Sequence, residues 1–154
     1  MQRVMTEELK TVLSRIMVVD DHEVARRGIR LVLAGHPGLD VVCEAVNDEE
    51  ALAGARELQP DIILMDISLP RRSGIQTAAS IREVSPESRI IFVSQHDSVQ
   101  IATNAVSVGA YGYVVKSEAG HDLLAAIEAA RKGEVFVSWT LAARGLKFHP
   151  MGRK

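Results

Sequence analysis

Short apolar runs alternate along this chain with longer segments in which apolar residues recur every three or four positions. Four of the runs end in a polar residue and have the composition of buried strands: IMVVDD, IILMD, IIFVS and YVVK. Strands are predicted over residues 15–20, 39–45, 61–66, 89–94 and 111–115, and helices over residues 23–34, 48–58, 74–84, 97–107 and 118–132. This alternation predicts an α/β fold, a three-layer doubly wound sandwich around a parallel sheet.

Polar residues and a glycine mark the predicted helix ends. Asn47 or Asp48 can cap the second helix, because a side-chain oxygen accepts hydrogen bonds from the free N–H groups of the first turn. Ser117 is predicted to cap the last helix and Gly133 to end it.

Reactive side chains follow the predicted strands directly. Asp20 and Asp21 end the first strand, Asp66 the third, Ser94 the fourth and Lys116 the fifth. Because the carboxyl ends of parallel strands meet at one edge of a sheet, these side chains are expected to converge. Three carboxylates, a hydroxyl and an ammonium predict a site for a divalent cation and a phosphoryl group.

The three acids would repel one another unless a cation neutralised them, since each close pair costs about 4 kcal/mol at an effective dielectric of 20. An all-oxygen cluster suits a hard ion and favours Mg²⁺ over Zn²⁺. The alternative is that Asp20 caps the following helix and Asp21 is simply solvated. Each acid alone fits that alternative, but the combination with Asp66 favours a metal site.

Asp66 is the candidate nucleophile, because a carboxylate beside Mg²⁺ can attack an activated phosphorus to form an aspartyl phosphate. Lys116 would bring positive charge to the phosphoryl oxygens, and the Ser94 hydroxyl would donate a hydrogen bond to them. Taken singly, Lys116 fits a solvated strand-end lysine and Ser94 an ordinary cap. Their joint position after apolar runs favours the functional interpretation.

Composition limits the possible classes of protein. The 154 residues are 47% hydrophobic and 25% charged with a formal net charge of -2, which suits one domain with one core. No apolar stretch is long enough to cross a bilayer, and Glu7 and Glu8 stand where a secretory signal would be apolar, so we expect a cytoplasmic protein without membrane contact. The single cysteine, Cys43, excludes an internal disulfide and fits a small buried hydrophobe.

Four segments occur in a characteristic order and spacing: VVDDHEVARRGIRLVL, PDIILMDISLP, IIFVSQHD and GAYGYVVKSEAGHDLLAAIEAARKGEVFVS. Through them, residues 14–138 resemble the CheY-like receiver domain of two-component response regulators. The DDHE, GYVVK and GEVFVS runs are most similar to the NarL/FixJ branch, whose members usually carry a LuxR-type helix-turn-helix after the receiver. The resemblance implies a flavodoxin-like fold with strand order 2-1-3-4-5, and a signalling module rather than an enzyme.

Carried over by position, the resemblance makes Asp66 the phospho-acceptor for a sensor histidine kinase or a histidine phosphotransfer protein. It implies that Mg²⁺ is ligated by Asp21, Asp66 and the backbone carbonyl of Ser68, with Asp20 acting through a bound water. Phosphorylation would add about −1.5 to −2 charge at Asp66.

The resemblance also implies a conformational switch. Ser94 corresponds to the switch hydroxyl, Tyr113 to the switch aromatic and Lys116 to the lysine of the family. The new charge would pull the loop after the fourth strand inward and favour an inward-facing Tyr113. The reporting surface would cover residues 97–132. The alternative for Tyr113 is an ordinary core aromatic.

Three positions depart from the family pattern or could tune the site. Ser117 follows Lys116 where many members have proline after a cis peptide, so the cis or trans state of this bond stays open. Gln95 is longer than the small residue common there and could narrow access to Asp66. Ser68 and His96 flank the site and could tune the attacking water, or His96 could be a plain loop residue.

Two groups of arginines are candidate docking sites for a kinase. Arg26 and Arg27 on the first helix are predicted to face a histidine-phosphotransfer bundle. Arg71 and Arg72 either help to dock the kinase or form a solvated turn.

The ends of the chain are expected to be extensions of the receiver. Residues 1–13 precede it, and residues 139–154 form a tail or short helix in which Trp139, Leu141 and Leu146 pack against the sheet edge or a second subunit. Only 16 residues follow Ser138, so we expect no DNA-binding domain and no direct DNA binding by this chain. The tail has four dispersed cations, which are weak support for nucleic-acid binding: Arg144, Lys147, Arg153 and Lys154.

Three functions follow from these expectations. The favoured one is a stand-alone receiver that signals to an unknown output protein through protein contacts, including a phosphorylation-dependent homodimer. The second is the receiver fragment of a LuxR-type transcriptional regulator. The third, a Mg²⁺-dependent phosphatase using Asp66, is opposed because no second acid stands two residues on to act as general acid.

Overall fold

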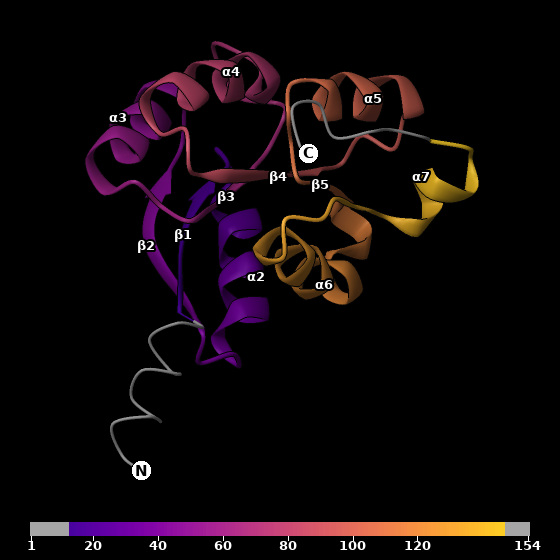
Figure 1. Cartoon of the computed structure of the whole chain (residues 1–154), viewed down its shortest axis with the longest axis horizontal. Coiled ribbons are helices and arrows are strands. Elements are labelled where there is room, and N and C mark those ends of the chain that lie inside the picture. The colour runs from indigo at the N-terminus through magenta and orange to yellow at the C-terminus, as the bar shows by residue number, and fades with distance from the viewer. Residues whose placement is uncertain (1–12, 147–154) are drawn as a thin grey trace.

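A six-stranded parallel sheet lies between two layers of helices in the computed structural model, which describes residues 13–146 (Figure 1). The strand order is β2-β1-β3-β4-β5-β6. The strands are β1 (Ser14–Val19), β2 (Leu39–Ala45), β3 (Ile62–Met65), β4 (Arg89–Ser94), β5 (Gly112–Val115) and β6 (Phe136–Val137). The helices are α2 (Glu23–Ala34), α3 (Asp48–Leu58), α4 (Gly74–Val84), α5 (Val99–Ser107), α6 (Ala119–Arg131) and α7 (Trp139–Ala143), and a 3-10 turn, η1, spans Lys116–Glu118.

Both faces of the sheet are buried, because strand residues alternate between two apolar clusters. In β3, Ile62 and Leu64 join the cluster under α2 and α6, whereas Ile63 and Met65 join the cluster under α3, α4 and α5 (Figure 1). Cys43 in β2 is half-buried against this second cluster. Burial raises the pKa of its thiol.

The predicted fold class and the strand order 2-1-3-4-5 are confirmed, with β6 as an added edge strand. The second strand and the first three helices have the predicted bounds. Helix α5 begins at Val99 instead of residue 97, because the Ser98 hydroxyl accepts the Ile101 N–H at 3.3 Å.

The start of α6 differs from the prediction. Ser117 lies within η1, and the residue before α6 is Glu118, which makes no side-chain cap, so the predicted Ser117 cap is wrong. The bond between Lys116 and Ser117 is trans, since the residues that the structure describes contain no cis peptide. Asn47 does cap α3 by accepting the Glu50 N–H at 2.8 Å.

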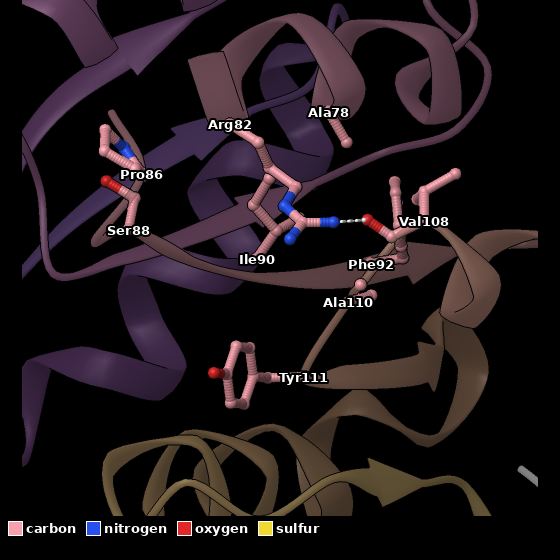
Figure 2. A pocket seen from close by; sticks show the side chains of 10 residues that line it. Ala78, Arg82, Pro86, Ser88, Ile90, Phe92, Val108, Ala110 and Tyr111 are labelled. Carbon is pink, nitrogen blue, oxygen red and sulfur yellow. Dashed lines mark hydrogen bonds between the residues drawn. The ribbon is translucent and has the colours of Figure 1, made fainter. Parts of the chain in front are cut away.

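Helix α5 is tied at its carboxyl end to α4. The Arg82 guanidinium donates to the Val108 carbonyl at 2.6 Å and borders a cavity of about 120 Å³ (Figure 2). Gly109 has φ +95°, and a Cβ there would lie 2.3 Å from the Arg82 Nη1 atom, so this turn requires glycine. The cavity lies at the amino ends of β4 and β5, away from the polar strand ends.

The segment after α6 folds back onto the sheet through β6 and α7. The buried Ser138 hydroxyl accepts the Val115 N–H at 3.0 Å and donates to Asp122 at 2.8 Å. Leu141 is fully buried, but Trp139 is 75% exposed, so its predicted packing against the sheet is wrong within this chain. The predicted short helix is α7. Of the four predicted tail cations, Lys147, Arg153 and Lys154 lie outside the described residues, as do residues 1–12.

The chain between residues 13 and 146 contains no helix with the length and apolar character needed to cross a membrane.

Candidate functional site

The polar residues that follow β1 and β3 meet where the strand order reverses, between these two neighbouring strands. The Asp20 N–H donates to the Ala45 carbonyl at 3.0 Å, and the Asp66 N–H donates to the Val19 carbonyl at 2.9 Å. These bonds continue the sheet and hold both residues at its edge. Asp20 is 1% exposed and Asp66 is 3% exposed, so both carboxylates are removed from bulk water.

Gly74, the first residue of α4, packs directly against the backbone of Asp66. Its N–H donates to the Ile67 carbonyl at 2.7 Å, and a Cβ at this position would lie 2.0 Å from the Asp66 carbonyl oxygen. Ser73 and Gln76 form a capping box that starts α4 at this point. Any larger residue at position 74 would displace Asp66. From the sequence, Gly74 was predicted only to open a helix.

Lys116 joins the two buried carboxylates. Its Nζ atom lies 2.8 Å from the Asp20 Oδ2 atom and 3.2 Å from the Asp66 Oδ2 atom. The lysine leaves β5 directly and its side chain is 25% exposed. The structure therefore brings together the two acids and the ammonium that the sequence placed at separate strand ends.

The electrostatics of this cluster are dominated by burial. Burial raises the pKa of the Asp66 carboxyl, the nearby Asp20 charge adds to this rise, and Lys116 opposes it. Burial alone lowers the pKa of the Lys116 ammonium, but the hydrogen bond to Asp20 and the charges of Asp66 and Asp20 together raise it above its usual value. Lys116 therefore remains charged and leaves the Asp66 charge only partly compensated.

Four side chains at this edge can hold a metal ion. The ligand atoms of Asp20, Asp21, His22 and Asp66 all lie within 4.8 Å of one another. Three of the four are carboxylates, the hard oxygen donors that suit Mg²⁺, which fits the donor chemistry expected from the sequence. The sequence interpretation did not assign His22 to the site, although His22 follows Asp21 directly and imidazole is a common metal ligand.

Ser68 and His96 meet at the rim of the site. The Ser68 Oγ and His96 Nε2 atoms lie 2.9 Å apart, and the Ser68 N–H donates to the Asp66 Oδ1 atom at 3.4 Å. Gln95, between Ser94 and His96, is exposed. The flanking position predicted for Ser68 and His96 is thus observed, and they form a direct contact that the sequence did not predict.

Ser94 and Tyr113 are linked through the loop that follows β4. The His96 N–H donates to the Ser94 Oγ atom at 3.1 Å, and the Tyr113 hydroxyl donates to the His96 carbonyl at 2.8 Å. Both Ser94 and Tyr113 are fully buried. Burial raises the pKa of the Tyr113 hydroxyl, against a hydrogen bond to Ser94 that lowers it. Tyr113 therefore faces inward and holds this loop.

Arg26 is bonded to residues around the site and is not a free cation for a docking partner. Its Nη1 atom donates to the Asp20 carbonyl and its Nε atom to the Glu44 carboxylate, each at 2.8 Å. The side chain is 13% exposed. Arg27 is exposed, so the predicted docking role stays a prediction for Arg27 and is weak for Arg26. Arg71 pairs with Glu49 at 3.1 Å on the neighbouring helix.

A doubly wound parallel sheet with buried acids, a lysine and a hydroxyl at its carboxyl edge is the arrangement expected of a receiver domain. Residues 16–128 match the family model of the response regulator receiver domain, and the chain belongs to this family. The family is one of signalling receivers and not of enzymes that turn over a separate substrate.

Within this family, the chain is similar to known response regulators that are longer than it is. The nitrate/nitrite response regulator protein NarL of Escherichia coli (strain K12) is 35% identical over 126 residues, which cover 82% of this chain and 58% of NarL. The response regulator GacA of Pseudomonas viridiflava is 34% identical over 128 residues, 83% of this chain and 60% of GacA. The chain thus spans about three fifths of the length of these relatives.

Solved structures agree with this placement. The crystal structure of a LuxR-family two-component response regulator from Aurantimonas sp. SI85-9A1 has a TM-score of 0.81 and 39% identity, covering 85% of this chain and 94% of that chain. The receiver domain of the putative response regulator NarL from Mycobacterium tuberculosis has a TM-score of 0.74 and 30% identity over 79% of this chain and 98% of that chain. The chain is therefore a receiver similar to those of NarL- and LuxR-family regulators.

Proposed function

We propose that this receiver accepts a phosphoryl group onto Asp66 from a sensor histidine kinase or a histidine phosphotransfer protein, with Mg²⁺ as cofactor. The observation that carries the proposal is the setting of Asp66, a buried carboxylate between the Lys116 ammonium and the acids of the β1 end. A carboxylate with its charge only partly compensated is a competent nucleophile for an electrophilic phosphorus.

The transfer uses groups that already contact Asp66. A carboxylate oxygen of Asp66 attacks the phosphorus, the P–N bond breaks, and its electron pair leaves on the histidine nitrogen. Lys116 lies 3.2 Å from Asp66 and is placed to follow the charge onto the phosphoryl oxygens. Ser94 would supply a hydrogen-bond donor to the same oxygens.

The metal would be held by Asp21, Asp66 and the Ser68 carbonyl, with Asp20 acting through a water. When bound, Mg²⁺ supplies neutralisation of the charge that develops on the transferring group. Three carboxylates within 4.8 Å of one another support this assignment.

Hydrolysis of the phosphoaspartate would be tuned by the rim residues. Ser68 and His96 contact each other at 2.9 Å and so restrict the approach of a water to Asp66. The exposed Gln95 side chain adds bulk at the same entrance. We therefore expect replacement of either contact partner to shorten the lifetime of the phosphoryl group.

The output would be a shift of the α5–β5–α6 surface. Because Tyr113 already faces inward, phosphorylation would stabilise an existing arrangement of the β4–α5 loop. The same loop is bound by α7, since the Arg144 Nη1 atom donates to the Asp97 carbonyl at 2.7 Å. A movement of this loop would therefore reach the C-terminal segment.

A kinase or a second copy of the receiver would bind beside the site. A groove of about 270 Å³ between α2 and α6 reaches Lys116 and is mostly apolar. Val24 is 83% exposed at its wall. An exposed apolar residue in a groove that reaches Lys116 supports the proposed docking of a kinase or phosphotransfer protein and a homodimer.

The proposal is tested by intact mass spectrometry after incubation with Mg²⁺ and acetyl phosphate. We expect one phosphoryl adduct on the wild type and on the control variant Asp40→Ala, which removes an exposed acid of β2, and none on Asp66→Ala. Size-exclusion chromatography of the same samples reports association. An adduct that persists in Asp66→Ala, or no adduct on wild type that binds Mg²⁺, would contradict the proposal.

A second function is favoured by the lengths of the relatives. The chain covers 58% of NarL and 60% of GacA, so it could act as the receiver part of a transcriptional regulator. Retention of a specific DNA by this 154-residue chain would favour that function.

A further inference from the structure

Asp48 is a buried acid that the chemistry at Asp66 does not use. It is the first residue of α3, and its side chain is 4% exposed. One carboxylate oxygen, Oδ2, lies 3.4 Å from the Arg71 Nη2 atom. The other, Oδ1, is buried and has no hydrogen-bond partner within residues 13–146, the part of the chain that the structure describes. Burying an acid with an unpartnered oxygen is unfavourable, so the Arg71 cation and the amino end of α3 must compensate its charge.

Arg71 comes from the loop between β3 and α4, residues 66–73, which begins with Asp66. Its Nη1 atom lies 3.1 Å from the Glu49 Oε1 atom, so the guanidinium bridges two successive acids of α3. Leu69, two residues earlier, is 9% exposed and belongs to the apolar cluster under α3, α4 and α5. The loop is thus held both by a charged contact with α3 and by packing in the core.

The same loop places Ser68 beside the phospho-acceptor. The Ser68 N–H donates to the Asp66 Oδ1 atom at 3.4 Å, and the Ser68 Oγ atom lies 2.9 Å from the His96 Nε2 atom. Ser68 is exposed, so packing in the core does not fix its position. The course of the loop on either side of Ser68 therefore sets where its carbonyl lies.

We propose that Asp48 and Arg71 are positioning residues, whose contact holds the β3–α4 loop so that the Ser68 carbonyl faces the site at Asp66. This inference deepens the proposed function and rests on it, because the Ser68 carbonyl is a proposed ligand of Mg²⁺. It also gives Arg71 a role within the receiver, in place of a docking contact or a solvated turn. Neither residue touches the reacting atoms, and both act through the loop.

The test compares Mg²⁺ affinity, by isothermal titration calorimetry of the full chain, in Arg71→Ala and Asp48→Asn. Each change breaks the contact, so we expect each to weaken Mg²⁺ binding at least about threefold, and the double variant to lose no more than the weaker-binding single variant. A direct charge effect has a different sign pattern, because loss of the Arg71 cation would strengthen Mg²⁺ binding and loss of the Asp48 charge would weaken it. Arg71→Lys, which keeps the charge, should restore part of the affinity.

Arg72→Ala is the matched control, because it removes a cation from the next residue of the loop, where the guanidinium donates to the Gln76 carbonyl and the Ser80 hydroxyl of α4. It should not weaken Mg²⁺ binding. Circular dichroism confirms that each variant is folded, and hydrogen–deuterium exchange of peptides that cover residues 66–73 measures the loop itself. We expect faster exchange there in Arg71→Ala and in Asp48→Asn than in the control.

The two readouts separate this inference from the proposed function. Loop exchange that is unchanged in Arg71→Ala and Asp48→Asn, or Mg²⁺ affinities that move in opposite directions, overturns the inference. Faster loop exchange with an unchanged Mg²⁺ affinity also overturns it, because the contact would then be structural only. Faster loop exchange in a chain whose wild type binds no Mg²⁺ supports the contact as the anchor of the loop and contradicts the proposed cofactor.

Discussion

Helices α5 and α6 cover opposite faces of the sheet next to β5, but different side chains attach them to it (Figure 1). Helix α6 has 13 residues and buries Leu123 and Ile127 almost completely. Helix α5 has 9 residues and buries two alanines, Ala102 and Ala105, and only one larger side chain, Val106. Full burial of a leucine or isoleucine contributes about 1.5–3 kcal/mol, and an alanine contributes far less.

Under the proposed function, this difference predicts which side of the receiver a phosphoryl group would move. A swing from 1:99 to 99:1 between two states needs about 5.5 kcal/mol of differential interaction. Displacing α6 would cost a comparable amount in lost packing, whereas α5 buries two alanines and one valine and would lose less. The loop between Ser94 and α5 carries His96, so a phosphoryl charge at Asp66 is predicted to act on the less firmly packed helix.

The largest expected effect is on the stability of the α6 side. Leu123→Ala should lower the free energy of unfolding by about 2–5 kcal/mol, because it leaves a cavity in a fully buried position. Ile101→Ala on α5, where the side chain is half-buried, should cost about 1 kcal/mol. Urea unfolding followed by circular dichroism measures both. Equal losses in the two variants would show that α5 is held as firmly as α6.

A smaller effect on stability is expected from the charge of the Asp66 carboxylate. The pKa of Asp66 is raised, so the folded protein binds more protons than the unfolded chain, and the stability contributed by this group falls as pH rises above about 4. At pH 7 Asp66→Asn removes this cost and should raise the free energy of unfolding and the Tm.

Thermal melts of wild type and Asp66→Asn at pH 7 and at pH 4 test whether the stability gain of the variant falls with pH. The gain should shrink from pH 7 to pH 4, because the raised pKa of Asp66 makes the folded wild type take up a proton more readily as the pH falls, and saturating Mg²⁺ should reduce it at pH 7. A gain that grows towards low pH would mean that the ionised carboxylate stabilises the fold.

The smallest effect is expected at the contact between α7 and the β4–α5 loop. Arg144 and Asp97 are both more than half exposed, so Arg144→Ala should change stability by less than about 0.5 kcal/mol. It should nevertheless speed amide hydrogen exchange in the loop, because a hydrogen bond to the Asp97 carbonyl is lost. Arg27→Ala, an exposed arginine on α2, is the matched control. Equal exchange in the two variants would show that α7 is not coupled to the loop.

Most of the sheet was predictable because its strands are buried on both faces and read as unbroken apolar runs. The segment IILM is such a run, and its Asp66 marks the strand end without ambiguity. The edge strand β6 was missed because it has two residues and pairs only with β5. Leu141 and Leu146 are buried as predicted, whereas Trp139 does not pack against the sheet, because hydrophobicity alone does not say which face of a five-residue helix turns inward; its packing against a second subunit stays a prediction.

At the site, position along the chain was enough to group Asp20, Asp66 and Lys116, since parallel strands bring their carboxyl ends together. The contacts of His22 with the acids, and of Ser68 with His96, depend on the course of turns. Turn geometry is set by local backbone angles and by distant partners such as Arg26, which a periodic pattern does not encode.

Hydrogen–deuterium exchange with and without phosphorylation separates the two sides of the receiver. The chain is incubated with Mg²⁺ and acetyl phosphate, intact mass confirms one adduct, and exchange is compared by peptide with that of Asp66→Ala treated identically. We expect the largest changes in exchange in α5, in the loop before it and in α7, and a smaller change in α6. A change of equal size in α6, or no change in α5, would contradict a switch built on the less firmly packed helix.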